Sequence, residues 1–188
     1  MTRLTPNPTI RQARFVDKSI NCIDRLTLVL GQSIAWLLLA MVLTQSLVVV
    51  LRYGFDIGFI AMQESVNYLH ACIFMLGASY GLKVDGHVRV DIFYRNFSPQ
   101  RQALVNLLGS LVLLLPMCGF IFWTSLDYVQ QAWAIKERSA DAGGLPIVYL
   151  LKTLIPLLAI CLALQAVAEI LRAYRTLTNG YQIGNSPS

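Results

Sequence analysis

The apolar residues of this chain gather in four long runs that are separated by polar segments. The runs cover approximately residues 28–51, 65–82, 104–126 and 148–171. A bilayer core is about 30 Å thick and a helix rises about 1.5 Å per residue, so one crossing needs roughly 20 mostly apolar residues. Each run has about that length. The pattern therefore predicts an all-α integral membrane protein with four transmembrane helices.

The segments outside these runs divide the chain into an N-terminal arm at 1–27, a transmembrane domain at 28–172 and a polar tail at 173–188. On a helix of the arm, the apolar side carries Ala13, Val16, Ile20 and Ile23, and the opposite side carries Arg11, Arg14, Lys18 and Arg25. That division is typical of a helix lying in the membrane interface with its basic face toward anionic lipid headgroups. We therefore predict an N-terminal interfacial amphipathic helix. A basic tether that only fixes topology is the alternative.

The distribution of the fifteen Lys and Arg residues predicts the orientation. One side of the predicted membrane receives Arg3, Arg11, Arg14, Lys18, Arg25, Lys83, Arg89, Arg95, Arg101, Arg172 and Arg175, and the other receives Arg52, Lys136, Arg138 and Lys152. By the positive-inside rule, both termini and the loop between the second and third helices face the cytoplasm. The net charge of +5 then reflects topology, and we expect no nucleic-acid partner.

The chain carries no visible apparatus for catalysis. No segment outside the runs reaches the roughly 50 residues that a soluble domain usually needs. Nucleotide-binding, metalloprotease and serine-hydrolase motifs are missing, and the four cysteines have no metal or redox spacing. His70 and His87 would lie about 25 Å apart on a helix, too far to ligate one haem together. We expect no enzyme activity, no metal site and no cofactor in this chain.

The second predicted helix is the most polar of the four. Asn67, His70, Phe74, Gly77 and Gly81 fall on one stripe of it, with Glu64 near its start. Polar and small residues in a membrane helix usually face protein, and ionisable ones are functional candidates. We therefore expect this stripe to face a partner or to organise the bundle. Two alternatives are capping with internal hydrogen bonding, and proton or ion handling.

Prolines and loop residues predict the remaining local structure. Ser98-Pro99 is a helix start, and Pro116 and Pro156 predict bends in the third and fourth helices. The outer loop 127–147 contains the mixed-charge run 136–146, in which Gly-Gly and Pro predict a turn. Such a loop suits a soluble partner, although a solvated turn has the same composition.

The order of several short motifs resembles the DctQ-like small membrane subunits of TRAP transporters over about 28–171. The motifs are Arg52-Tyr53 closing the first helix, Glu64 opening the second, Gly77 within it, Gly86-His87-Val88-Arg89-Val90-Asp91 in the cytoplasmic loop, and Ser139, Pro146 and Pro156 around the entry to the fourth helix. The resemblance implies a tripartite transporter in the bacterial inner membrane. In it, a periplasmic substrate-binding protein captures an organic anion and a large permease subunit moves it with sodium.

On this resemblance the chain scaffolds the large subunit, has no transport route of its own, and leaves sodium to that subunit. Its expected partners are the large TRAP permease subunit, the periplasmic substrate-binding protein and membrane lipids. The residues expected at the large-subunit interface are Glu64, Asn67, His70, Gly77, Gly81, His87, Arg89 and Asp91. Those expected at the periplasmic docking surface are Arg52, Lys136, Glu137, Arg138, Ser139 and Asp141. The alternative function is a self-contained oligomeric proton- or ion-coupled carrier that uses Glu64 and His70.

Overall fold

The computed structural model describes residues 8–84 and 97–183, and these form helices joined by short loops. Its elements are α1 (Pro8–Phe55), α2 (Ile60–Lys83), α4 (Pro99–Leu108), the π-helical turn η1 (Gly109–Leu114), α5 (Leu115–Ala134) and α6 (Val148–Ile183). Side chains are described for 16–84 and 97–178.

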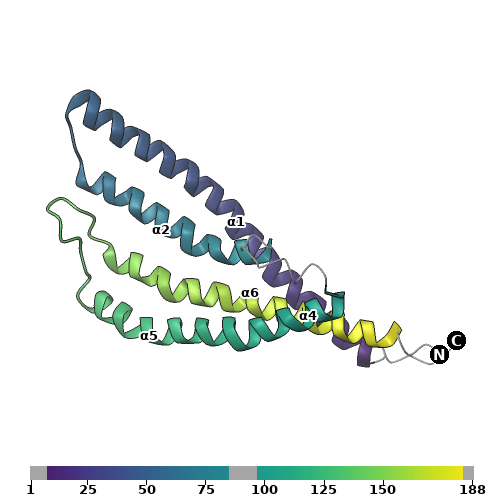
Figure 1. Ribbon diagram of the computed structural model, residues 1–188. Coiled ribbons are helices and arrows are strands. Elements are labelled where there is room, and N and C mark those ends of the chain that lie inside the picture. The colour runs from purple at the N-terminus through teal and green to yellow at the C-terminus, as the bar shows by residue number, and fades with distance from the viewer. Residues whose placement is uncertain (1–7, 85–96, 184–188) are drawn as a thin grey trace, which may run out of the picture.

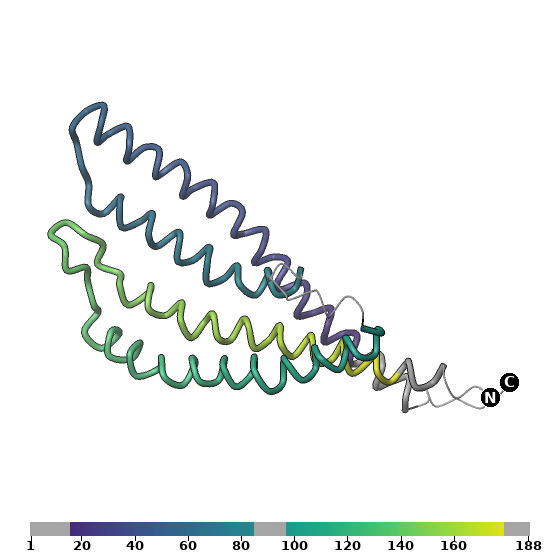
Figure 2. The backbone as a smooth tube through the Cα atoms, in the orientation of Figure 1, coloured from purple at the N-terminus to yellow at the C-terminus, as the bar shows by residue number. Residues whose placement is uncertain are grey.

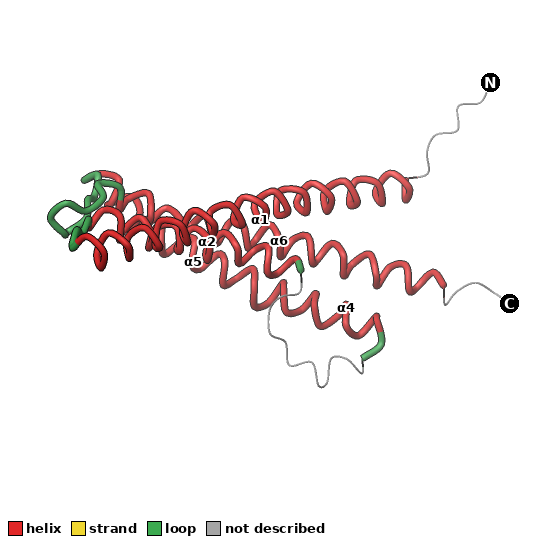
Figure 3. Tube along the Cα trace, turned by 90° about the horizontal axis from the view of Figure 1, so that it is seen from above, coloured by secondary structure: helices red, strands yellow, loops and turns green. Residues whose placement is uncertain are grey.

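The long helices form one layer rather than a bundle around a core. Contacts join α1 to α2, α2 to α6 and α6 to α5, which gives the order α1, α2, α6, α5 across the layer (Figure 1). The first part of α1 also contacts α6 directly. Seen after a quarter turn, the four helices overlap near the outer loops and fan apart toward α4 (Figure 3). The layer is therefore one helix thick near the outer loops. Toward α4 it twists, because the helix axes diverge there.

The chain runs through this layer as two helical hairpins, α1 with α2 and α5 with α6 (Figure 2). The connections 56–59 and 135–147 lie together at one end of the layer. The start of α1 and the end of α6 are both at the opposite end of the layer (Figure 1). We call the end with the two connections the outer end and the opposite end the inner end.

Three stretches of the described residues are long and apolar enough to cross a membrane. They are Val16–Phe55, Pro99–Ala134 and Val148–Thr178. Helix α2 is not among them, because Gln63, Glu64, Asn67 and His70 interrupt its apolar sequence. At about 1.5 Å per residue its 24 residues would still reach across a bilayer core. The all-helical membrane fold is confirmed, and a fourth crossing by α2 stays a prediction.

The first helix begins within the N-terminal arm. Helix α1 runs without a break from Pro8 to Phe55. No glycine or proline lies between Pro8 and Gly31, so nothing in the sequence stops the helix there. The residues from 16 onward continue the axis of α1, and Asp17 and Asp24 form ion pairs with α6.

The third apolar run is divided by a local change of helical pitch. The Leu115 N–H donates to the Ser110 carbonyl, five residues back, at the end of η1. Pro116 follows directly and has no N–H to continue the regular pattern. In Figure 2 the path from α4 through η1 to α5 is curved. Pro156 lies inside α6, which continues to Ile183.

Small residues occupy the buried positions between the helices. On α6 these are Ala159, Ala166, Ala168 and Ala173, and the neighbouring helices contribute Ala103, Cys118, Ala132, Ser79, Ser110 and Ser125. Small side chains let membrane helices approach closely and pack through van der Waals contact. These small residues allow α6 to contact α1, α2, α4 and α5, so α6 takes the central position.

Ion pairs and hydrogen bonds join α1 to α6 near the inner end. Arg172 pairs with both Asp24 of α1 and Glu169 of α6. Arg175 pairs with Asp17 at 2.6 Å, and the Lys83 ammonium donates to the Asp24 carbonyl at 2.7 Å. The ion pairs fix the first part of α1 against the last part of α6, and the Lys83 contact joins the end of α2 to α1.

Replacing Arg172 with Gln is expected to lower the melting temperature of the purified chain in detergent. Side-chain exposure is 31% for Arg172 and 25% for Asp24, so solvent screening limits the effect to about 1 kcal/mol or less. Arg175→Gln is the matched control. Its pair is more exposed, at 56% and 40%, and a smaller shift is expected. An equal or larger shift for Arg175→Gln would contradict this ranking.

Candidate functional site

Glu64, in the first turns of α2, holds the loop between α5 and α6. One carboxylate oxygen accepts a hydrogen bond from the Ser139 hydroxyl, and the other accepts one from the Leu145 N–H at 2.6 Å. The Ser139 hydroxyl also accepts from the Asp141 N–H at 3.1 Å, and the Ser139 N–H donates to the Leu145 carbonyl at 3.1 Å. We call Glu64, Ser139, Gly144 and Leu145 the outer clasp. It joins the two hairpins.

The clasp keeps Glu64 in its ionised form. Glu64 precedes the span predicted at 65–82 and faces the outer loop. The hydrogen bond from Ser139, followed by that from the Leu145 N–H, lowers the pKa of this carboxyl below its ordinary value. A charged acceptor also makes both hydrogen bonds stronger than neutral ones.

The loop can reach Glu64 only because two glycines allow its path. Gly143 has a φ of +86°, a left-handed conformation that glycine adopts at little cost. At Gly144, a Cβ would lie 2.5 Å from Ser139 Oγ, 2.6 Å from Ser139 Cβ and 2.7 Å from Glu64 Oε1. The backbone of Gly144 thus occupies the space that any larger residue would need.

Aromatic and charged side chains fix the junction of α5 and α6 beside the clasp. Lys152 pairs with Glu137 at 2.5 Å, and its ammonium lies 4.0 Å from the centre of the Tyr128 ring. The Trp133 and Tyr149 rings meet edge to face at 4.7 Å, and the Trp133 N–H donates to the Thr153 hydroxyl at 2.9 Å. These contacts hold the base of the loop between the two helices.

The residues expected at the periplasmic docking surface fall into two groups. Ser139 and Glu137 are engaged within the chain, by Glu64 and by Lys152. Lys136, Arg138 and Asp141 are exposed on the same loop, and Arg52 is exposed at the end of α1. The outer loop therefore presents two cations and one carboxylate on a backbone that the clasp holds in place.

The residues expected on one stripe of α2 have two different surroundings. Asn67 and His70 are exposed, and Phe74 is 71% exposed. Gly77 instead faces α1, since a Cβ there would lie 3.8 Å from Ile34 Cδ1. Gly81 is partly covered. We call Asn67, His70 and Phe74 the open stripe.

Three further residues expected at the large-subunit interface lie outside the described part of the chain. These are His87, Arg89 and Asp91. Among the residues that the structure describes, no group of three or more His, Cys, Asp or Glu could hold a metal ion.

Sequence reasoning missed a buried polar contact between α1 and α6. Gln165 is fully buried, and its Oε1 lies 3.1 Å from the Thr27 hydroxyl, which also contacts the Ile23 carbonyl at 3.0 Å. One hydroxyl hydrogen serves only one acceptor, so a flipped amide that donates to Thr27 satisfies both groups better. A glutamine within the apolar run 148–171 was the available signal, but the sequence did not show its partner.

The comparison with protein families identifies one match. The model of the DctQ component of tripartite ATP-independent periplasmic transporters matches residues 38–176, well over half of the chain. The matched region includes α2, the outer clasp and most of α6. Comparison with curated proteins gives no match, and comparison with solved structures gives none either.

Proposed function

The chain belongs to the DctQ family of tripartite transporter components, and from this membership we propose that it scaffolds the large permease subunit of a TRAP transporter. The transporter would import organic acid anions with sodium, and sodium would bind to the large subunit. The chain would lie in the bacterial inner membrane with both termini in the cytoplasm.

The single-layer architecture supports the scaffold role most directly. The most apolar 18-residue stretch of α1 has none of its residues buried, and that of the Pro99–Ala134 segment has only 11% buried. Even the central helix α6 reaches only 28%. A transport route needs helices that surround a site near the bilayer midplane. One layer of helices offers two broad faces instead, which suits a brace beside a larger membrane protein.

The open stripe indicates which face of the layer would meet the large subunit. Asn67 and His70 are exposed on α2 beside Phe74. If α2 lies in the membrane, their polar groups need partners that lipid tails cannot supply. We therefore propose that this stripe packs against helices of the large subunit.

A photo-crosslinking amino acid at position 70 tests this interface. In membranes that contain all three transporter components, we expect crosslinks from position 70 to the large subunit. The matched control is position 120 on α5, where Phe120 is 68% exposed. Crosslinks from position 120 without any from position 70 would show that another face of the layer binds the large subunit.

The outer loop would contribute to docking of the periplasmic binding protein. Lys136, Arg138 and Asp141 are exposed there, and the clasp fixes the loop that carries them. Arg52, near the end of α1, lies apart from this loop and lines a groove between α1 and α2. His87 and Asp91, expected on the cytoplasmic side, are proposed to contact the large subunit. His87→Ala or Asp91→Ala should therefore lower the amount of large subunit that co-purifies with the chain.

Asp141→Lys is expected to weaken docking of the binding protein while the membrane complex stays intact. The substitution reverses an exposed charge whose own side chain does not take part in the clasp. Binding is measured by surface plasmon resonance on the immobilised membrane complex. Glu137→Lys is a less suitable test because it also breaks the pair with Lys152. Unchanged binding of Asp141→Lys would remove this residue from the docking surface.

The alternative of a self-contained carrier gains no support from the described residues. A coupling carboxylate must be free to exchange protons or ions, but both oxygens of Glu64 accept hydrogen bonds from the outer loop. His70 is exposed on the surface of the layer rather than enclosed with Glu64.

A further inference from the structure

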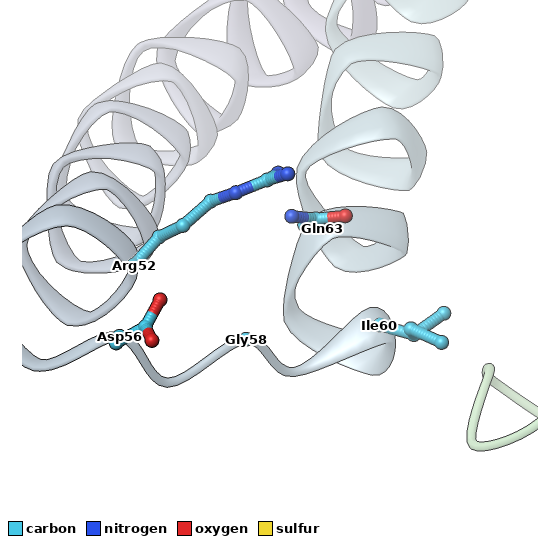
Figure 4. Close-up of a pocket in the computed structure, with 5 residues that line it drawn as sticks. All are labelled: Arg52, Asp56, Gly58, Ile60 and Gln63. Atoms are coloured by element: carbon cyan, nitrogen blue, oxygen red, sulfur yellow. The ribbon is translucent and has the colours of Figure 1, made fainter.

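A polar groove lies between the outer ends of α1 and α2. It consists of two adjoining hollows of about 280 Å³ and 270 Å³ that share Arg52 and Gln63. The deeper hollow is also lined by Gln45 and by Asn67, the outermost residue of the open stripe, so the groove borders that stripe. The outer hollow is lined by Asp56, Gly58 and Ile60 (Figure 4).

The groove holds two opposite charges that do not neutralise each other. Within the described part of the chain, neither Arg52 nor Asp56 has an ion pair. In Figure 4 the Arg52 side chain extends across the groove toward α2, and the Asp56 carboxylate stands at the level of the connection. A ligand with one anionic and one cationic group could satisfy both.

The backbone fixes Asp56 at the mouth of the groove. Asp56 ends α1 in the left-handed conformation, with a φ of +57°. Aspartate tolerates this region better than most residues. The next N–H, that of Ile57, returns to the Leu51 carbonyl at 3.0 Å. The backbone at Asp56 is thus set by the end of the helix.

Apolar side chains share the deeper hollow with its polar groups. Val48, Val49 and Val66 line the deeper hollow, and Tyr53 stands at its edge with 82% of its surface exposed. A cation and an aromatic ring at the end of an apolar helix are typical of the membrane interface. The groove therefore passes from headgroup level toward the acyl region.

The size of the groove limits what can occupy it. A helix with its side chains is about 10–12 Å across. A hollow of about 280 Å³ is too small for such a cylinder beyond a single turn. A lipid headgroup fits this volume, and the three valines offer a contact surface for the start of one acyl chain.

We propose that this groove binds one phospholipid with an ethanolamine headgroup. The phosphate lies against Arg52 with hydrogen bonds from the amides of Gln63 or Gln45, and the primary ammonium donates to Asp56. The acyl chain follows Val48, Val49 and Val66. A choline headgroup carries no N–H and cannot donate to Asp56, so the groove prefers ethanolamine.

Native mass spectrometry of the purified full-length chain tests the proposal. The chain is incubated with equal amounts of phosphatidylethanolamine, phosphatidylcholine and phosphatidylglycerol, and retained lipid is counted. The unchanged chain is expected to retain phosphatidylethanolamine in preference to the other two. Arg52→Gln should reduce retention of all three about tenfold, since each loses a charge-assisted phosphate contact. Asp56→Asn should abolish only the preference for ethanolamine. Arg101→Gln, which changes an exposed arginine at the start of α4, should alter nothing.

Three results would overturn the proposal. The first is equal retention of phosphatidylcholine and phosphatidylethanolamine by the unchanged chain. The second is unchanged retention after Arg52→Gln at an unchanged melting temperature. The third is that Arg52→Gln retains lipid as before but no longer co-purifies with the large subunit. That result would assign the groove to a side chain of the large subunit. Lipid binding here does not require the large subunit, so the scaffold role and the lipid site can fail separately.

Discussion

Replacing Gly144 with Ala is expected to open the outer clasp and separate the two hairpins at the outer end of the layer. The new Cβ would lie 2.5–2.7 Å from two atoms of Ser139 and one oxygen of Glu64. Ser139 Cβ is bonded directly to the loop backbone. It therefore cannot rotate out of the way, as the end of a long side chain could. Overpacking of this kind costs about 1–3 kcal/mol.

The loss should appear both in stability and in function. We expect a lower melting temperature of the purified chain and weaker binding of the periplasmic protein to the assembled transporter. Gly58→Ala is the control, because it lies in the other outer connection and a Cβ there meets nothing within 4 Å. Ser139→Ala should also weaken the clasp, because it removes one hydrogen bond to Glu64 without adding atoms. If Gly144→Ala binds and melts as the unchanged chain does, the clasp does not organise the loop.

Replacing Gly31 with Ala is expected to push α1 away from α2. A Cβ at position 31 would lie 2.5 Å, 2.8 Å and 3.0 Å from Cδ2, Cε2 and Cγ of Tyr80. Two effects of opposite sign compete. Alanine favours a helix over glycine by about 1 kcal/mol, whereas overpacking costs about 1–3 kcal/mol. Because Cγ lies at the fixed base of the ring, a small rotation does not relieve the contact, and destabilisation should win.

A pair of further variants separates the two effects at Gly31. Tyr80→Leu should suppress the destabilisation by Gly31→Ala, because it removes the ring that the Cβ would meet. Gly77→Ala is the matched control on α2. Its Cβ would lie 3.8 Å from Ile34 Cδ1, an ordinary contact, so this variant should be neutral or slightly more stable. The measurement is the melting temperature, in one detergent, of Gly31→Ala, Tyr80→Leu, the variant that combines these two, and Gly77→Ala. If Gly31→Ala lowers the melting temperature equally with Tyr80 and with Leu at position 80, the destabilisation arises in the backbone of α1.

The sequence predicted the features that depend on local pattern. Apolar runs predicted the helices that the structure contains, and the segment from Gly86 to Asp91 with its flanking motifs indicated the DctQ family, which the family comparison confirmed. The helix start at Ser98-Pro99 was also local, and α4 begins at Pro99. Hydropathy did not predict that α1 continues through the arm, because composition changes near residue 27 while backbone propensity does not.

The contacts that shape the candidate site are long-range, and hydropathy carries no information about them. Glu64 could be identified as an unusual carboxylate, but its partners Ser139 and Leu145 lie 75 and 81 residues away. Gln165 reaches Thr27 over 138 residues. The single-layer order is likewise set by small residues on α6, whose pairing with each neighbour depends on the rotation of the helices. The stripe on α2 was predicted as one surface, yet Gly77 faces α1 while Asn67 and His70 remain exposed.

The central claim is that this chain braces a transporter and provides no route through the membrane itself. Sodium-driven uptake of the substrate into proteoliposomes tests it most directly, with the small chain alone, the large subunit alone, and both together with the binding protein. We expect uptake only when the chain and the large subunit are reconstituted together, and none from the chain alone at any density. Uptake by the chain alone, abolished by Glu64→Gln, would contradict the account.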